Sequence, residues 1–241
     1  MATLRDRVAP RTKSLVFVAL PVVLLLAFAV ATYTPMFHAR DVRIDGATTI
    51  SRDEVLRLAG IGPGTNVFHL DTGAAERALT TDPWIASAVV ERDLPETVVI
   101  RIHERAPVAR SSTGSTSVAV AGDGVVLPGA STTGLPEIRA SVGALTDDVR
   151  TGAAGALAAL EPILRARVSA VVVEPSGELL LDLAGGLTVR YGTAGEDAAK
   201  AIALRAVLGW AAEQHVAVRD VDVTVPQAPS ATLADGSTVT P

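Results

Sequence analysis

Residues 82–109, DPWIASAVVERDLPETVVIRIHERAPVA, decide the fold of the first half of this chain. In the second part of this stretch, Val98, Ile100 and Ile102 fall on one face of a strand, and Val99, Arg101 and His103 fall on the other. The residues from Arg92 to Glu96 supply a turn between this strand and an earlier apolar run. The pattern predicts a β-hairpin, and it contains no catalytic motif.

The residues before the hairpin predict the rest of a small α/β module. A short strand is expected at 42–46, and Ser51 with Glu54 three residues later is typical of a capping box that begins a helix. Gly60 is placed to end that helix. Small and apolar residues at helical spacing predict a second helix at 72–79. The expected order is therefore β-α-α-β-β.

This module resembles the POTRA domain of the FtsQ/DivIB family of bacterial cell-division proteins. The resemblance rests on Asp82-Pro83-Trp84-Ile85, then Leu94-Pro95, then Glu104-Arg105-Ala106-Pro107-Val108-Ala109, in that order. It implies a POTRA-like domain over residues 37–109, with two helices on one face of a three-stranded sheet. Such a sheet leaves an edge strand open to pairing with another chain.

A membrane anchor is predicted near the N-terminus. Residues 15–33, Leu15 to Tyr33, contain no charged side chain, and as a helix they would span about 28 Å. Arg5, Arg7, Arg11 and Lys13 precede this segment, so the positive-inside rule places residues 1–14 in the cytoplasm. The prediction is a single-pass type II protein of the cell membrane with its C-terminal domains outside the cytoplasm.

A cleaved signal peptide is the alternative, because Ala29-Val30-Ala31 matches a cleavage pattern. The apolar run is longer than the usual core of a signal peptide. The family resemblance also favours an anchor that stays attached. Both readings place the residues after about 34 outside the cytoplasm.

A second module is predicted after a Ser/Thr/Gly-rich linker at 110–117. It covers residues 118–234 and is followed by a polar tail at 235–241. Gly122-Asp123-Gly124 predicts a hairpin, helices are expected at 153–167 and 197–213, and Pro162 is expected to kink or split the first. Strands are expected near 135–138, 168–173, 178–183, 187–191 and 218–225, and the family resemblance implies a terminal edge strand at 230–233.

This module resembles the β-domain of the same family. The matching features are Asp123-Gly124, Leu135-Pro136, Tyr191-Gly192 before a helix carrying Lys200, and Val221-Asp222-Val223 ahead of Pro226. The fold class predicted for the chain is α+β: one transmembrane helix, a POTRA-like module, then a mixed β-sheet domain with two helices.

Composition and motifs argue against catalysis, metal binding and nucleic-acid binding. The chain has no cysteine and a formal net charge of −5, which disfavours disulfides, thiolate metal sites and nucleic-acid binding. Arginine far outnumbers lysine and alanine is abundant, a composition like that of actinobacterial proteins. His38, His69, His103 and His215 lack metal-ligand spacing, and His103 is expected on the outward face of its strand. The Gly-rich segment 60–64 follows a helix and contains Pro63, so a loop is favoured over a phosphate site. We expect no enzyme activity, cofactor, metal or small-molecule substrate.

The resemblance implies a scaffold at the division septum that links early and late division proteins and couples division to septal cell-wall synthesis. It implies partners of the FtsB/DivIC and FtsL type, bound by strand addition at the last sheet edge. The POTRA domain would be a second contact surface, used for recruitment to the division site. The residues implied at the partner-binding edge are Val223, Val225, Gln227, Ser230, Ala231, Thr232 and Leu233. Lys200 is left open between a solvent-facing residue and a partner contact.

Two other functions were weighed. A POTRA-containing secretion or outer-membrane assembly factor would need several POTRA repeats or a C-terminal barrel, and the sequence has neither pattern. An anchored cell-wall hydrolase would need a metal triad or a nucleophile with its base. Neither alternative is favoured by the residues.

Overall fold

The computed structural model describes residues 11–113 and 116–240, with side chains described from Leu20 onward except at Thr113. The chain forms two compact units, one ending at Glu104 and the other beginning at Arg105. Each unit has its own cluster of buried apolar side chains, and each is described by itself.

The first unit begins with helix α1 (Arg11–Ala31), followed by a short 3-10 helix, η1 (Pro35–Phe37). The predicted anchor, 15–33, overlaps α1, but its first five residues fall where side chains are not described. In the part of the chain where side chains are described, no helix is long and apolar enough to cross a bilayer. The membrane anchor therefore stays a prediction.

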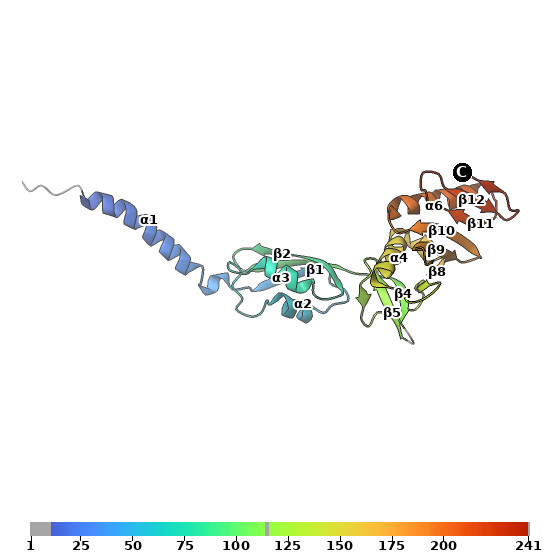
Figure 1. Ribbon diagram of the computed structural model, residues 1–241. Coiled ribbons are helices and arrows are strands. Elements are labelled where there is room, and N and C mark those ends of the chain that lie inside the picture. Colours follow the sequence, from blue (N-terminus) through green and yellow to red (C-terminus); the bar gives the residue numbers. More distant parts are fainter. Residues whose placement is uncertain (1–10, 114–115, 241) are drawn as a thin grey trace, which may run out of the picture. The chain divides into compact units, whose positions relative to one another are not determined.

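The rest of this unit has the β-α-α-β-β order that the sequence predicts (Figure 1). Its sheet has the strand order β1-β3-β2, in which β1 is parallel to β3 and β2 is antiparallel to it. The elements are β1 (Asp41–Asp45), α2 (Arg52–Ala59), α3 (Thr72–Leu79), β2 (Ile85–Asp93) and β3 (Thr97–Glu104).

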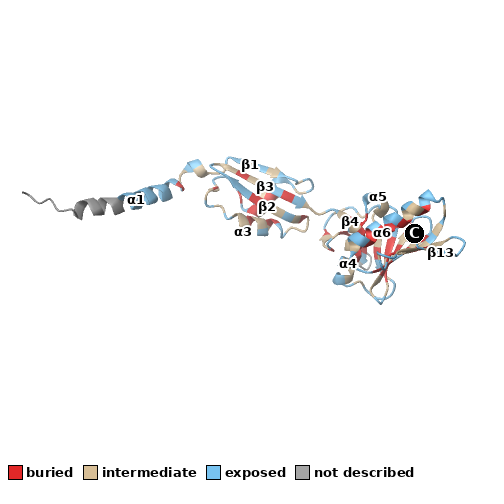
Figure 2. Ribbon diagram, turned by 90° about the horizontal axis from the view of Figure 1, so that it is seen from above, coloured by how far each residue is buried: buried red, intermediate tan, exposed pale blue. Residues whose placement is uncertain are grey.

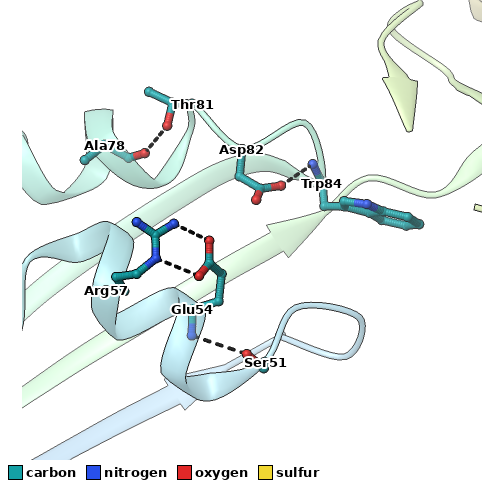
Figure 3. A network of polar contacts seen from close by, with 7 residues as sticks. All are labelled: Ser51, Glu54, Arg57, Ala78, Thr81, Asp82 and Trp84. Carbon is teal, nitrogen blue, oxygen red and sulfur yellow. Dashed lines mark hydrogen bonds and ion pairs between the residues drawn. The ribbon is translucent and has the colours of Figure 1, made fainter. Parts of the chain in front are cut away.

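Local sequence signals explain the ends of α2. The Ser51 hydroxyl accepts a hydrogen bond from the backbone N–H of Glu54, and Gly60 ends the helix in the left-handed conformation at φ 67°. The Glu54 carboxylate pairs with the Arg57 guanidinium, three residues further along the helix (Figure 3). Of the predicted capping box, only the Ser51 hydrogen bond is therefore present, because Arg57 competes for the Glu54 side chain.

The alternating pattern of apolar and polar residues along β3 determines which of its side chains enter the core of the unit. Val98, Ile100 and Ile102 are buried against α2 and α3, whereas Arg101 and His103 are exposed. The opposite face of the sheet carries no helix. The outward position predicted for His103 is confirmed.

The second unit is a two-layer α/β domain built on one mixed sheet (Figure 1). Its strand order is β13-β12-β11-β10-β9-β8-β7-β4-β5-β6. The strands are β4 (Pro107–Thr113), β5 (Thr116–Ala121), β6 (Val126–Leu127), β7 (Glu137–Ala140), β8 (Val168–Val173), β9 (Glu178–Leu183), β10 (Leu187–Thr193), β11 (Val218–Asp222), β12 (Ser230–Leu233) and β13 (Thr238–Val239). The helices are α4 (Asp147–Ala159), α5 (Pro162–Arg165) and α6 (Asp197–Glu213).

Helices α4 and α6 pack against each other and against one face of this sheet. Leu157 and Leu204 contribute fully buried side chains from the two helices, and Leu181 and Val189 do so from the strands beneath them. Figure 2 shows this band of buried residues between the helices and the sheet. The other face of the strands carries half-buried and exposed polar side chains, including Thr188 and Arg190.

Three sequence expectations for this unit are corrected. The described residues of the predicted linker, 110–113 and 116–117, belong to β4 and β5, which pair with each other. The helix expected at 153–167 begins six residues earlier, at Asp147. The split expected at Pro162 is confirmed, since Leu160 leaves the helical conformation and Pro162 opens α5. The strand expected at 218–225 ends at Asp222.

Candidate partner-binding edge

The C-terminal end of the large sheet is the candidate site, and its outermost strand is not the one that the sequence indicates. The segment Ser230–Leu233 does form a strand, β12, but it lies between β11 and a further strand, β13. β13 comes from the predicted polar tail and pairs Val239 with Ala231 and Thr238 with Thr232. The edge expected at β12 is thus covered over two of its four residues.

The turn that brings β13 back is built by polar residues. The Asp235 carboxylate accepts hydrogen bonds from the backbone N–H of Ser237 at 2.9 Å and from its hydroxyl at 2.7 Å. These two bonds lower the pKa of Asp235. Gly236 adopts φ 87°, and its N–H donates to the carbonyl of Leu233. Asp-Gly-Ser is therefore a tight turn that reverses the chain onto β12.

The predicted contact residues divide by burial. Val223 and Ala231 are 0% and 1% exposed, and both belong to the core under α6. Val225 is 56% exposed, and Gln227 is exposed as well. Ser230, Thr232 and Leu233 are half-buried. The accessible part of the predicted set is the segment that leads into β12 and the outward-facing hydroxyls of that strand.

Lys200 is not a surface residue. It is 4% exposed on the inner side of α6, and its Nζ donates to the carbonyl oxygen of Thr193 at 2.6 Å. The same ammonium lies 5.2 Å from the centre of the Tyr191 ring. The solvent-facing interpretation of Lys200 is therefore wrong, because its ammonium binds the carbonyl at the end of β10. The same burial disfavours a direct contact between Lys200 and a partner, which stays a prediction.

Tyr191 belongs to the same buried arrangement. Its side chain is fully buried, and its hydroxyl donates to the backbone carbonyl of Asp197 at 3.0 Å. Burial and the nearby Asp197 carboxylate raise the pKa of Tyr191 far above its usual value. The phenol therefore stays neutral and serves to hold the start of α6 on the sheet.

A shallow depression of about 410 Å³ lies on the sheet face beside the candidate edge. Cross-strand register places Thr188, Asp220 and Thr232 in one row, and Arg190, Asp222 and Ser230 in the next. Arg190 lies 3.7 Å from Asp222, and Arg219 lies 2.8 Å from Asp220. The depression is open and lined by side chains of both charges, which suits the side chains of an added peptide better than a small molecule.

No titratable cluster of a catalytic kind lies at this edge. Across residues 20–112 and 116–240, no three His, Asp or Glu side chains gather in a way that could hold a metal ion. Among the described carboxylates, Glu104 in the first unit has the most strongly lowered pKa. Its side chain stabilises the loop at 48–50.

Comparison with known proteins gives the same domain at the same place. The FtsQ-type POTRA domain family matches residues 37–105. Cell division protein FtsQ of Mycolicibacterium smegmatis is 32% identical over 198 residues, which is 81% of this chain and 60% of that protein. Cell division protein FtsQ of Mycobacteroides abscessus is 29% identical over 193 residues, 78% of this chain and 62% of that protein.

The chain thus spans about 60% of the length of these curated relatives. Among solved structures, the major extracytoplasmic domain of the trans isomer of the cell division protein DivIB from Geobacillus stearothermophilus matches with a TM-score of 0.33 and 17% identity. That match covers 45% of this chain and 92% of the solved chain.

Proposed function

Because the chain belongs to the FtsQ/DivIB family of cell-division proteins, we propose that it acts in bacterial cell division as a membrane-anchored scaffold. The observation that carries this proposal is the FtsQ-type POTRA domain at 37–105 together with 32% identity to an FtsQ protein over 81% of the chain. In this role the protein has no chemistry of its own. It links early and late division proteins at the septum and so couples division to septal cell-wall synthesis.

The proposed location is the cell membrane, with the N-terminus in the cytoplasm. The uncharged segment 15–33 and the four basic residues before it support this topology. The POTRA domain and the second unit then lie outside the cytoplasm, and neither can form a disulfide because the chain has no cysteine.

The proposed partners are membrane proteins of the FtsB/DivIC and FtsL type, and the proposed mode is strand addition at the C-terminal edge. β13 has only two residues, so it leaves much of β12 available to a longer partner strand. The partner either extends the sheet beyond β13 or replaces it on β12. The hydroxyls of Ser230 and Thr232 and the charges of Arg190 and Asp222 would contact the side chains of the added strand.

The assignment of partner binding to the C-terminal edge can be tested with proline substitutions, which remove backbone donors and block strand pairing. Ala231 is a poor position for this test because it is 1% exposed and paired on both sides. The double variant Thr238→Pro/Val239→Pro acts on the outermost strand instead. It should lose co-purification with the FtsB/FtsL-type pair while keeping its circular dichroism spectrum.

Val126→Pro is the matched control, because β6 is also a two-residue strand and lies at the opposite edge of the same sheet. It should retain the partners. Equal retention of partners by both folded variants would rule out the C-terminal edge.

The cellular role has its own test. Depletion of the protein should give filamentous or branched cells without septa under the microscope. Normal septation after depletion would exclude a role in division. Turnover of purified peptidoglycan by the wild-type protein, lost on a point substitution, would instead indicate a hydrolase.

A further inference from the structure

Two separate segments of the first unit meet at one end of its sheet. The turn between β2 and β3 lies there, next to the segment that leads from α1 into β1. The backbone N–H groups of Arg40 and Asp41 both point to the carbonyl oxygen of Glu96, at 2.9 and 3.4 Å. The Arg40 guanidinium also pairs with the Glu96 carboxylate at 3.0 Å. This end of the domain is therefore the end that faces α1.

Asn66 fastens the end of α1 to this domain. Its amide nitrogen donates to the carbonyl oxygen of Thr32 at 2.7 Å, and its amide oxygen accepts from the N–H groups of Phe68 and His69. Thr32, the residue after α1, is only 2% exposed. One side chain thus satisfies a carbonyl at the helix end and shapes the loop at 66–69.

The Thr32 hydroxyl adds a contact to the His69 ring. This hydroxyl donates to the carbonyl of Ala29 at 2.7 Å, so it accepts from His69 Nε2 at 3.1 Å. The hydroxyl thus links the last turn of α1 to the 66–69 loop.

Aromatic rings also pack where the end of α1 meets the domain, a region that we call the junction. The Phe68 ring lies edge-on to Phe28 and Phe37, with centroids 6.2 and 5.6 Å apart, and His69 stacks on Tyr33 at 4.3 Å. The N–H of Val67 donates to the carbonyl of Phe37 at 2.7 Å. The helix end is consequently packed onto the domain by rings and backbone hydrogen bonds.

Several large apolar side chains remain exposed around this junction. Tyr33, Met36 and Leu94 are 70%, 58% and 50% exposed, and Phe68 is half-buried beside them. We call these four residues the apolar rim. Two of them come from the connection after α1, one from the 66–69 loop and one from the β2–β3 turn. The rim continues directly into α1, whose described leucines and valines are themselves exposed.

We propose that the apolar rim lies in the interfacial layer of the bilayer that holds α1, so that the POTRA domain has a second contact with the membrane. The inference rests on the anchor proposed above and adds the surface that meets the lipid. Aromatic and amphipathic side chains favour the boundary between acyl chains and headgroups. Arg40 and Glu96, which adjoin the rim, are charged and suit the headgroup layer.

The test uses tryptophan fluorescence of the full chain in phospholipid nanodiscs, with lipids brominated near the headgroup end of their acyl chains as quenchers. Leu94→Trp places the probe on an exposed turn residue of the rim. Thr49→Trp is the matched control, because Thr49 is exposed and its N–H bonds to Glu104, at the other end of β3. Trp84 and Trp210 contribute the same background to both variants.

Leu94→Trp should lose clearly more fluorescence in brominated lipid than the parent chain does, whereas Thr49→Trp should match the parent. Phe68→Trp is a second rim probe and should behave like Leu94→Trp. Equal quenching of all three variants would overturn the proposal. So would a Leu94→Trp signal that responds only to addition of the FtsB/FtsL-type pair, since a protein would then cover the rim.

Alkaline extraction of cell membranes that contain the full chain separates the two proposals. A chain that stays in the bilayer but shows no rim quenching contradicts the interfacial contact alone. A chain that is released from the bilayer contradicts the anchor, and the rim contact with it.

Discussion

Glu104 stabilises a loop at the end of the first unit. Its carboxylate accepts hydrogen bonds from the Thr48 hydroxyl at 2.6 Å and from the backbone N–H groups of Thr48, Thr49 and Ile50. Partial burial raises the pKa of Glu104, but the bonds from Thr48, Ile50 and Thr49 outweigh it and lower the pKa to about 2. The folded unit therefore prefers the ionised carboxylate.

This preference predicts a pH-dependent stability. The folded pKa is lowered from 4.5 to about 2, so the stabilisation is fully present above pH 4.5 and is lost as the pH falls towards 2. Glu104→Gln should lower the free energy of unfolding at pH 7 by about 2 kcal/mol, a value reduced to allow for partial solvent exposure. Denaturant melts from pH 7 to 3 should show the difference from wild type shrinking with acid.

Glu91→Gln is the control for this change. Glu91 is also a β-strand glutamate, but it is exposed and pairs with Arg101 at the surface. Its substitution should change stability little at any pH. A constant gap between Glu104→Gln and wild type across the pH range would contradict the assigned carboxylate contacts.

Lys200 gives a second test at the level of a single side chain. Lys200→Met keeps the length of the side chain but leaves the Thr193 carbonyl without its 2.6 Å donor. We expect a loss of about 1 kcal/mol, since the lost charge-assisted bond outweighs the relief of a buried ammonium. Binding of the FtsB/FtsL-type pair to the folded variant, measured by calorimetric titration, should be unchanged. A selective loss of binding would return Lys200 to the partner surface.

Among the structural elements, the turn between β5 and β6 depends on a glycine for two reasons. Gly124 has φ 81°, and a Cβ atom there would lie 2.1 Å from the hydroxyl oxygen of Thr151 on α4. Gly124→Ala should therefore cost about 3 kcal/mol through backbone strain and overpacking. Gly129→Ala is the control, because Gly129 has φ 72° but nothing lies within 4 Å of its Cβ position. Thermal melts should show the smaller loss, about 1 kcal/mol, for Gly129→Ala.

Elements with strong local signals were predictable from the sequence. Helix 72–79 and strands β8 and β9 agree with the predicted bounds, and the cap residues Ser51 and Gly60 mark α2 correctly. These elements carry their own periodicity, caps or turns, so neighbouring residues suffice to place them.

Elements that depend on distant partners were missed. The Ser/Thr/Gly-rich stretch 111–117 has the composition of a linker, yet its residues 111–113 and 116–117 are strand, because β5 and β7 pair with β4. β13 is only Thr238–Val239 and has no apolar pattern of its own; it exists because β12 offers hydrogen-bonding groups beside it. The burial of Lys200 likewise depends on the carbonyl of Thr193 at the end of β10. Tertiary contacts override local preference in each case.

At the scale of the whole molecule, the boundary between the two units falls between adjacent residues. Glu104 binds the loop at 48–50 of the first unit, while Arg105 pairs with Asp123 of the second at 2.7 Å. The two apolar clusters contain no residue in common. Each unit is therefore expected to unfold as its own cooperative transition.

Calorimetry of residues 34–241 should resolve two transitions, and the two substitutions argued above assign them. Glu104→Gln should lower the midpoint of one transition and Gly124→Ala that of the other, because each acts within a separate core. The double variant should show both shifts with the sizes found in the single variants. A single transition moved by either substitution would mean that the units unfold together, and the boundary at 104/105 would then separate them in structure but not in stability.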